Sequence, residues 1–320
     1  MYPKYSFIVP VYNVENYVEE CIRSLLRQTY ESFEIIIVDD GSTDDSYQRC
    51  AQYVSANKNI CIIRQENMGL GEARNTGLRK ARGKYVIFVD SDDFWDKADS
   101  LEKIENTLNQ FECDVLCVDF LFLDNNTGKK KNRNIRLSNK INYLSADKRI
   151  KKLLIRKGLG FSAWNKVLSR DFLLTNNLLF NKGLSEDMDW TARLLMLTQK
   201  IYYLDEEIYV YREKRSGSIT NTVKRDFLKG WCEILDRIFT YNSEIVNEVN
   251  EKSENKYYYF SKIYRIILIN YLKSRTADRY IRSKVLEYKY LIPYLTGIKM
   301  LPIKVANFFS LDLFLKILNK

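Results

Sequence analysis

Three carboxylates lie within four positions, directly after a short apolar stretch. Asp90, Asp92 and Asp93 follow Tyr85–Val89, and a run of that length, rich in β-branched residues, predicts a buried strand. Carboxylates this close together repel one another, and removing them from water is costly. A cation would relieve that cost, and a hard divalent metal that also touches phosphate is the usual one. An Asp-x-Asp pattern alone is weak evidence, because a solvated acidic turn after a strand has the same sequence.

A second acidic pair lies far later in the chain. Ser185 is predicted to be an N-cap, which places Glu186 and Asp187 in the first turn of a helix. The helix macrodipole favours an ionised carboxylate there, which suits a base, although acidic residues also occupy first turns for stability alone. Together the two clusters predict a divided site, in which one carboxylate group holds metal and leaving group and the other takes a proton.

The chain contains no histidine. This excludes Ser-His-Asp and Cys-His catalysis, His-ligated zinc and a histidine base. Acid–base chemistry must therefore use carboxylates, Lys, Tyr or Cys. The six cysteines form no C-x-x-C pair and lie mostly in apolar patterns, which predicts reduced core thiols in the cytoplasm.

The first part of the chain alternates between apolar strands and amphipathic helices. Strands are predicted at Tyr5–Val11, Phe33–Val38, Asn59–Arg64 and Lys84–Asp90. Ser42 followed by Asp45 predicts a capping box at the start of the second helix. Such alternation predicts a parallel sheet covered on both faces, which binds ligands beyond the carboxyl ends of its strands. Three strands end in polar clusters: Tyr12-Asn13, Asp39-Asp40 and Asp90-Ser91-Asp92. We expect these clusters to meet at one edge.

The later elements are less regular. Strands are predicted at Asp114–Leu123, Ile201–Leu204 and Ile208–Tyr211. The basic segment Lys129–Arg136 is either solvated surface or a hairpin connection. From about Asp226 onward the pattern is helical, aromatic and basic.

All of the excess positive charge lies in the tail. The net charge is +10, and Lys256–Lys320 contains thirteen Lys/Arg against three Asp/Glu, interleaved with thirteen aromatic residues. Amphipathic helices are predicted around Ile263–Ile269 and Leu311–Leu318. This composition predicts contact with an anionic membrane surface; the alternative is a helical cap whose charges are merely solvated. Nucleic acid is not an expected partner, because no known module is present and residues 1–255 are neutral overall.

No apolar run approaches the ~20 residues that a membrane-spanning helix needs. Met1–Lys4 leads directly into the first strand, without the pattern of a signal peptide. We therefore expect a cytoplasmic protein that is peripheral at the inner face of the cell membrane.

A series of short segments follows a recognisable order. They are Ser6–Asn13, Gln28-Thr29, Val38–Asp44, Gly71–Gly77, Gly83–Tyr85, Asp90–Asp93, Trp164-Asn165-Lys166 and Glu186-Asp187. This ordered set resembles the family 2 glycosyltransferases of the bacterial surface-polysaccharide type. The resemblance implies an α/β GT-A fold, with a Rossmann-like, mostly parallel sheet and flanking helices, plus a C-terminal helical, basic-aromatic extension. The implied domains are 1–223, divided into a nucleotide-binding half (1–95) and an acceptor half (96–223), and a helical region at 224–320.

The resemblance also implies a nucleotide-sugar site. Its residues would be Pro10, Tyr12, Asn13, Asp40, Arg74, Asp90, Ser91 and Asp93. Pro10, Tyr12 and Asp40 would cradle the uracil and ribose of a UDP-sugar. Arg74 would help to hold the nucleotide or its diphosphate.

The same resemblance implies which residues bind the metal ion and which residue is the general base. Asp92, assisted by Asp90, would bind Mn²⁺ or Mg²⁺ at the diphosphate, and Asp93 would face the donor sugar or the acceptor. Asp187 matches the family's general base, with Glu186 beside it.

The implied reaction is an inverting transfer of one sugar from UDP-Glc, UDP-Gal or an N-acetyl analogue. The acceptor would be a saccharide hydroxyl, as on an undecaprenyl-diphosphate-linked saccharide, and the product a β-glycoside for O-antigen, capsule or exopolysaccharide. The Q-x-x-R-W motif and transmembrane helices of processive synthases are not found in the sequence, which favours addition of a single sugar. Many relatives have a histidine near Arg212–Ser218, where this chain has Lys214 and Arg215. One of these cations, or Arg212, could steady the diphosphate instead.

Two alternatives remain open. A non-catalytic nucleotide-sugar-binding protein could keep the fold and lose the chemistry, although Asp90, Asp92 and Asp187 argue against it. A sugar-nucleotidyltransferase also uses an acidic metal site, but its glycine-rich loop normally follows the first strand, where this chain has Val11–Asn13. A dinucleotide oxidoreductase is not supported, because no G-x-G-x-x-G follows a strand.

Overall fold

The computed structural model describes residues 2–133, 135, 137–183, 185–215, 225–245, 254–274 and 278–296. The chain forms two compact units: Met1–Trp190 with Thr198–Asn221, and Thr191–Leu197 with Thr222–Lys320. The domain boundary after residue 223 stays a prediction.

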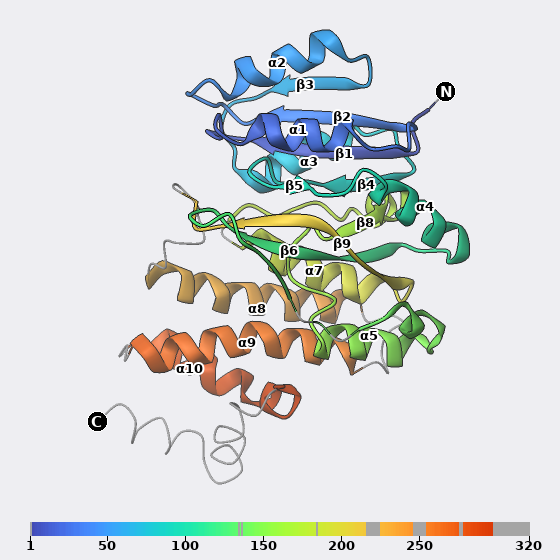
Figure 1. Ribbon diagram of the computed structural model, residues 1–320. Coiled ribbons are helices and arrows are strands. Elements are labelled where there is room, and N and C mark those ends of the chain that lie inside the picture. The colour runs from blue at the N-terminus through green and yellow to red at the C-terminus, as the bar shows by residue number, and fades with distance from the viewer. Residues whose placement is uncertain are drawn as a thin grey trace. The chain divides into compact units, whose positions relative to one another are not determined.

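The first unit contains a mixed sheet (Figure 1). Its strands are β1 Tyr5–Val11, β2 Phe33–Asp39, β3 Ile60–Arg64, β4 Tyr85–Phe88, β5 Phe94–Trp95, β6 Val115–Asp124, β7 Lys130–Asn132, β8 Lys166–Ser169 and β9 Ile201–Glu213. Within the described residues the order is β3-β2-β1-β4-β8-β6-β9-β5, with β7 paired to β6. Strands β1 to β4 are parallel, as are β6 and β9, whereas β8 and β5 run antiparallel to their neighbours. The predicted α/β fold with a mostly parallel sheet is confirmed.

Helices cover both faces of the β1–β4 region. The helices of this unit are α1 Val18–Leu26, α2 Ser46–Ala56, α3 Leu70–Lys80, α4 Ser100–Gln110, α5 Ala146–Ile155, α6 Arg170–Thr175 and the start of α7 Glu186–Leu197, with a 3₁₀ turn at Asn139–Tyr143. Phe7 lies in the same buried cluster as Leu25 of α1. Ile8 points to the opposite face and meets α3, where a Cβ at Gly77 would lie 2.3 Å from Ile8 Cγ2. Only glycine allows α3 to approach β1 so closely.

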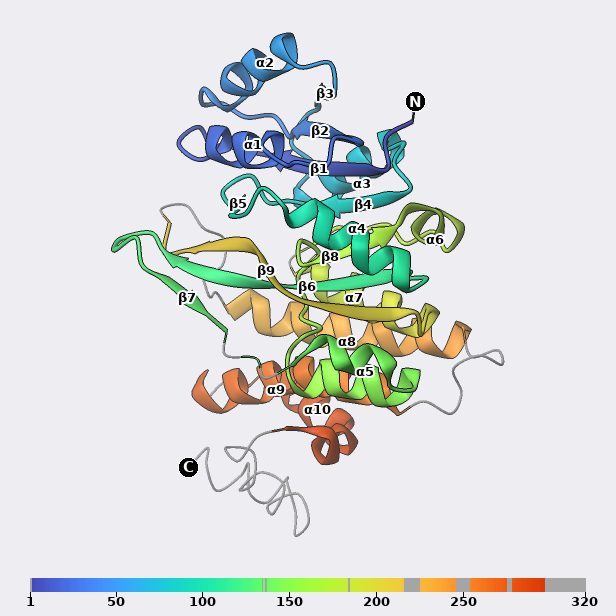
Figure 2. The ribbon, with the colours of Figure 1, turned by 45° about the vertical axis from the view of Figure 1, so that its right-hand side comes forward.

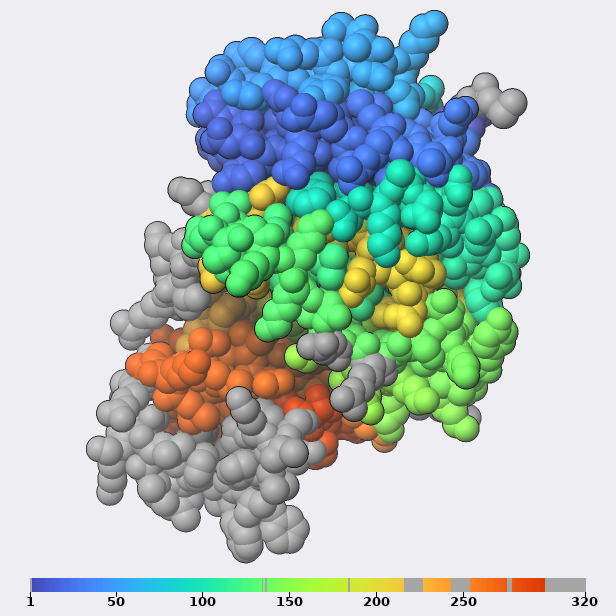
Figure 3. Space-filling model, in the orientation of Figure 1, coloured from blue at the N-terminus to red at the C-terminus, as the bar shows by residue number. Residues whose placement is uncertain are grey.

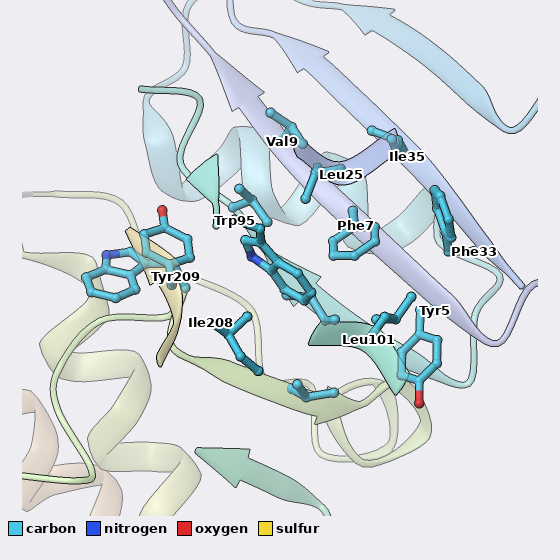
Figure 4. Close-up of a cluster of buried hydrophobic side chains, with 14 of the residues drawn as sticks. Tyr5, Phe7, Val9, Leu25, Phe33, Ile35, Trp95, Leu101, Ile208 and Tyr209 are labelled. Carbon is cyan, nitrogen blue, oxygen red and sulfur yellow. The ribbon is translucent and has the colours of Figure 1, made fainter. Parts of the chain in front are cut away.

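The buried cluster joins the two halves of the sheet (Figure 4). Phe7 packs edge-on against Trp95, with ring centroids 5.0 Å apart, and against Phe33 at 5.6 Å. Ile208 and Tyr209 of β9 belong to the same cluster. Trp95 follows the acidic turn, and Tyr209 lies on β9. Because both belong to this buried cluster, the cluster holds the acidic turn against β9.

Two predicted element boundaries are wrong. Helix α2 begins at Ser46 instead of Ser42, and Asp45 makes no capping hydrogen bond. The Ser42 N–H instead donates to Asp39 Oδ1 at 3.3 Å, so Ser42 belongs to the turn after β2. The two strands predicted between residues 201 and 211 are one strand, β9, with register shifts against β6 around Asp119.

The basic segment after β6 contains one strand of a hairpin and is also exposed, so its described residues agree with both interpretations of this segment. β7 pairs antiparallel with β6 from Leu121↔Asn132 to Leu123↔Lys130, and Figure 2 shows the two strands side by side. All three β7 residues are exposed, and the hairpin (green) lies at the surface in Figure 3.

The second unit is helical, as predicted. It contains α8 Arg225–Ile245, α9 Asn255–Ser274, α10 Arg279–Glu287 and a 3₁₀ segment at Tyr288–Tyr294. Tyr259, Tyr264 and Tyr271 of α9 are buried within it, so these aromatic rings are core residues instead of surface contacts. The helix predicted at Ile263–Ile269 lies in α9, whereas Leu311–Leu318 falls outside the described residues. In the ranges that the structure describes, no helix is both long and apolar enough to cross a bilayer.

Candidate active site

The first acidic cluster forms the turn between β4 and β5. Asp93 N–H donates to the Asp90 carbonyl at 3.0 Å and closes this turn. The buried Tyr209 ties it to β9, because its hydroxyl donates to Asp93 Oδ2 at 2.7 Å and accepts from the Asp90 N–H at 3.1 Å. Tyr209 was not predicted as a site residue, since nothing in its strand pattern distinguishes it from a core tyrosine.

The carboxylates of this turn affect one another electrostatically. Burial raises the pKa of Asp92, and the charge of Asp90 raises it further, against the opposing effect of Arg215. Burial, followed by the charges of Asp92 and Asp90, raises the pKa of Asp93 well above its usual range. A cation placed among these oxygens would therefore be strongly stabilised.

Asp92 is contacted by two arginines, Arg212 in β9 and Arg215 just after the end of that strand. Arg215 Nε forms an ion pair with Asp92 Oδ2, and Arg212 Nε donates to the Asp92 carbonyl at 3.0 Å. Lys214 instead pairs with Asp124 Oδ2, at 2.5 Å, next to the β6–β7 hairpin. Of the three cations considered for the diphosphate, Arg212 and Arg215 are thus next to the acidic turn.

Arg74 of α3 joins the two acidic clusters. Its side chain is 1% exposed, and its Nη2 donates to Asp90 Oδ1 at 2.8 Å. Its Nη1 donates to Asp187 Oδ1 at 2.6 Å and to Glu186 Oε1 at 3.1 Å. These charges raise the pKa of the guanidinium, and the carboxylates from two distant parts of the chain meet around it. The geometry gives Arg74 carboxylate partners where the sequence predicted a nucleotide contact.

The acidic pair at the start of α7 does not have the expected low pKa. Burial, followed by the charge of Asp187, raises the pKa of Glu186 to about 7. Burial also raises the pKa of Asp187, although Arg74 opposes it. Ser185 has a left-handed φ of 59° and makes no capping hydrogen bond through its side chain. Desolvation therefore outweighs the favourable effect of the helix N-terminus.

The predicted uracil and ribose residues lie at the carboxyl ends of β1 and β2. Asp40 is buried, and its carboxylate accepts hydrogen bonds from Met68 N–H (2.9 Å), Gly69 N–H (2.9 Å) and Gln65 Nε2 (2.8 Å). Gly69 has a φ of 91°, which a side chain would strain, so the turn that contacts Asp40 requires glycine there. Tyr12 is 48% exposed at the same edge and available for stacking.

The remaining predicted residues are Pro10, Asn13 and Ser91, which lie in or next to the ends of β1 and β4. Pro10 lies in β1 opposite Val38 of β2. Asn13 has a left-handed φ of 51°, and its Oδ1 accepts the Thr43 N–H at 2.9 Å. Ser91 is buried in the acidic turn. The prediction that the strand ends meet at one edge agrees with this placement.

A loop before β8 contacts the base candidate. Ala163 N–H donates to Asp187 Oδ2 at 3.1 Å. The fully buried Lys166 binds the same loop through its ammonium. In the sequence, Trp164–Lys166 was singled out only as part of the ordered set of motifs. The pattern that could have pointed to Lys166 itself is a lysine directly before the apolar pair Val167-Leu168.

Comparison with known proteins identifies the family. The family model described as "Glycosyl transferase family 2" matches residues 6–174. The glycosyltransferase GlyA of Streptococcus pneumoniae is 34% identical over 68% of this chain, but the match spans only 31% of GlyA. The putative glycosyltransferase EpsH of Bacillus subtilis is 32% identical over 79% of this chain and 72% of its own length.

Solved structures show the same fold. A crystal structure of S. aureus TarS residues 1–349 in complex with UDP-GlcNAc has a TM-score of 0.66 and 22% identity, over 92% of this chain and 82% of that one. This likeness confirms the predicted GT-A fold. The family match and the relatives also confirm the prediction of a transferase. The chain belongs to glycosyltransferase family 2.

Proposed function

We propose that this protein transfers one sugar from a UDP-sugar to a hydroxyl of a saccharide acceptor, with inversion at the anomeric carbon. The observation that carries this proposal is the Arg74 network. It brings Asp90, beside the expected diphosphate position, together with Asp187, the expected base. An in-line displacement needs these two functions on either side of one reacting carbon.

A divalent ion fits the acidic turn. Asp92 and Asp90 supply the hard oxygen ligands that Mn²⁺ or Mg²⁺ prefers, and their mutual repulsion favours a cation. Within the described residues no three such side chains form a complete metal site, so oxygens of the donor diphosphate would have to complete the ligand set. When bound, the ion supplies Lewis-acid stabilisation of the leaving diphosphate. Arg215, which forms an ion pair with Asp92, would also contact that diphosphate in this proposal.

Asp187 acts as the base in this proposal. One of its oxygens accepts the acceptor hydroxyl proton while the hydroxyl oxygen attacks the anomeric carbon from the face opposite UDP. The anomeric bond to the diphosphate breaks as the new bond forms, so an α-linked donor gives a β-glycoside. Glu186 shares Arg74 with Asp187 and therefore responds to its protonation state.

We assign the donor and the acceptor from the carboxyl ends of β1 and β2 and from the proteins that this chain resembles. We assign uracil and ribose to the edge that contains the exposed Tyr12 and the buried Asp40. TarS has been crystallised with UDP-GlcNAc and with UDP, which supports a UDP-sugar as donor. We propose UDP-Glc, UDP-Gal or an N-acetyl analogue as donor. A relative named minor teichoic acid biosynthesis protein GgaB, from Bacillus subtilis, is 28% identical over 78% of this chain. That match spans only 27% of GgaB, and its name supports a role in surface-polysaccharide assembly. As acceptor we propose an undecaprenyl-diphosphate-linked saccharide.

The basic tail supports a peripheral position at the inner face of the cell membrane. Anionic headgroups would attract its excess of Lys and Arg. Part of that charge is neutralised by an ion pair within the protein, because Lys284 Nζ lies 2.8 Å from Asp236 Oδ1. Co-sedimentation of the full chain with anionic vesicles, but not with neutral ones, is the expected result.

The test of the reaction is UDP release from a panel of UDP-sugars with a lipid-linked GlcNAc or GalNAc acceptor. We expect release with Mn²⁺ and none with EDTA. Asp187→Asn should abolish transfer and leave UDP affinity nearly unchanged, because in this proposal Asp187 acts on the acceptor hydroxyl and not on the nucleotide. Near-normal turnover in that variant would exclude Asp187 as the base.

A further inference from the structure

We propose that Lys166 is a positioning residue for the base Asp187, acting through the loop that contains Ala163. This inference rests on the proposed role of Asp187. The loop lies between the two residues: Lys166 binds its carbonyls, and Ala163 binds the carboxylate.

The ammonium group of Lys166 is surrounded by oxygens of a single loop. Lys166 begins β8 and is 0% exposed. Its Nζ donates to Asn165 Oδ1 at 2.9 Å, to the Gly160 carbonyl at 3.2 Å and to the Ser162 carbonyl. The three protons of an ammonium thus match three oxygens of one short loop.

Such a lysine is costly as a mere core residue. A buried charge is tolerated only when it is hydrogen-bonded or paired, and an apolar side chain of similar volume is often as stable. The three oxygens around Lys166 Nζ are neutral, so no carboxylate in direct contact cancels the charge of the ammonium. That charge lowers the pKa of Asp187. This points to a role that an apolar residue could not fill.

The same loop contacts the proposed base through the backbone of Ala163. Asp187 Oδ2 accepts the Ala163 N–H at 3.1 Å, whereas Asp187 Oδ1 accepts from Arg74 Nη1 at 2.6 Å. The two oxygens are therefore held from two sides, by a side chain of α3 and by the backbone of the loop. Because Ala163 follows Ser162, whose carbonyl Lys166 binds, the ammonium fixes the direction of that N–H.

The charges around the two residues determine the direction of the pH effect. Asp187 faces Arg74 and Lys166, which lower its pKa, and Asp90, which raises it; Glu186 is its ionisable neighbour. Lys166 faces Asp187, Cys117 and Arg133, and burial lowers its own pKa to about 8. Loss of the ammonium and of the ordered N–H should therefore raise the pKa of Asp187.

The test uses Lys166→Met, which keeps the length of the side chain and removes its charge. We expect kcat to fall about 10- to 100-fold, the penalty of a misplaced catalytic group, with the KM for the UDP-sugar changed less than about twofold. The acid limb of the kcat–pH profile should move to higher pH. The ratio of native to variant kcat should shrink above about pH 8, where native Lys166 also loses its proton. An equal loss at every pH, or no loss, would overturn the proposal.

Arg149→Met is the matched control. Arg149 is also a buried cation that binds backbone carbonyls, those of Ile201 at 2.7 Å and Leu144 at 2.9 Å. Its loss should lower thermal stability and leave the kcat–pH profile unshifted. A shift of the same size in this variant would show that any buried-cation deletion has the effect, and would overturn the proposal.

If Lys166→Met does not fold, a milder variant, Asn165→Ala, tests the same proposal. Asn165→Ala removes one of the three ammonium acceptors, and we expect a smaller shift of the acid limb in the same direction. An unshifted limb in folded Asn165→Ala and Lys166→Met would refute the role of Lys166 while leaving the base intact. Retained turnover in Asp187→Asn would instead refute the proposed base, so the two failures are distinguishable.

Discussion

Replacement of Arg74 by methionine should make the stability of the protein fall as pH rises. The native guanidinium is 1% exposed, and the carboxylates that it contacts are mostly buried, with Asp90 and Asp187 each 21% exposed and Glu186 13%. Removing one partner from a buried ion network costs about 3–5 kcal/mol when the remaining charges stay ionised. The carboxylates can avoid this cost by binding protons.

The direction of the pH effect follows from linkage. Arg74 lowers the pKa of Glu186 and Asp187 in the native protein, so in the variant their folded-state pKa lies still further above the unfolded value. Groups with a raised folded-state pKa contribute stability that is present at low pH and lost as pH rises through that pKa. Because the pKa of Glu186 is already about 7, the loss should be about 3–5 kcal/mol at about pH 8 and less than half of that near pH 5.

Urea denaturation of the native protein and Arg74→Met, followed by tryptophan fluorescence from pH 5 to pH 8, measures this difference. Arg79→Met on the same helix is the control. Arg79 is 53% exposed and lies 2.8 Å from Glu72 Oε1, so its loss should cost less than about 1 kcal/mol. An equal destabilisation by Arg74→Met at pH 5 and pH 8 would show that lost packing, not unbalanced charge, causes the effect.

Two further variants test the acidic turn. Asp92→Asn should remove the gain in UDP affinity that Mn²⁺ gives the native protein, about tenfold or more, which is about 1.4 kcal/mol; titration calorimetry with and without Mn²⁺ measures whether the native protein has the gain that we expect and whether the variant loses it, and an unchanged gain would exclude Asp92 as the proposed metal ligand. Tyr209→Phe leaves the Asp90 N–H and Asp93 Oδ2 without the hydroxyl that joins them. It should lower the free energy of unfolding by about 1–3 kcal/mol and reduce kcat/KM in the UDP-release assay, and normal values of both would contradict the role given to the hydroxyl.

The strands and their polar ends were predictable because their signals are local. Continuous apolar runs such as Tyr5–Val11 indicate buried parallel strands, and the rule that ligands bind beyond strand ends places Asp40 and Asp90 at one edge. The position of β8 between β4 and β6 was not predictable in this way. It depends on pairing between residues far apart in the chain, such as Val86 and Leu168, which periodicity does not encode.

Arg74 and Arg215 were named from the sequence as possible contacts of the nucleotide or its diphosphate, but their carboxylate partners were not predictable, for the same reason. The acidic residues stand out in the sequence because they cluster at strand and helix ends. Their cations come from separate elements: Arg74 from α3 and Arg215 from the end of β9. The partners Arg74 and Asp187 are 113 positions apart, and only the folded sheet brings them together.

This arrangement makes the ionisation of the base depend on the correct folding of several elements. Asp187 is held by a guanidinium from α3 and a backbone N–H from the loop before β8, and α3 reaches its position because Gly77 fits against Ile8. A Gly77→Ala substitution would push α3 away from β1 and would move the Arg74 guanidinium away from Asp187. Arg74 lowers the pKa of Asp187 and so opposes the effect of burial on it. The pKa of Asp187 would then rise, although no charged group had been altered. The position of α3 against β1 is therefore part of the mechanism that we propose for the base.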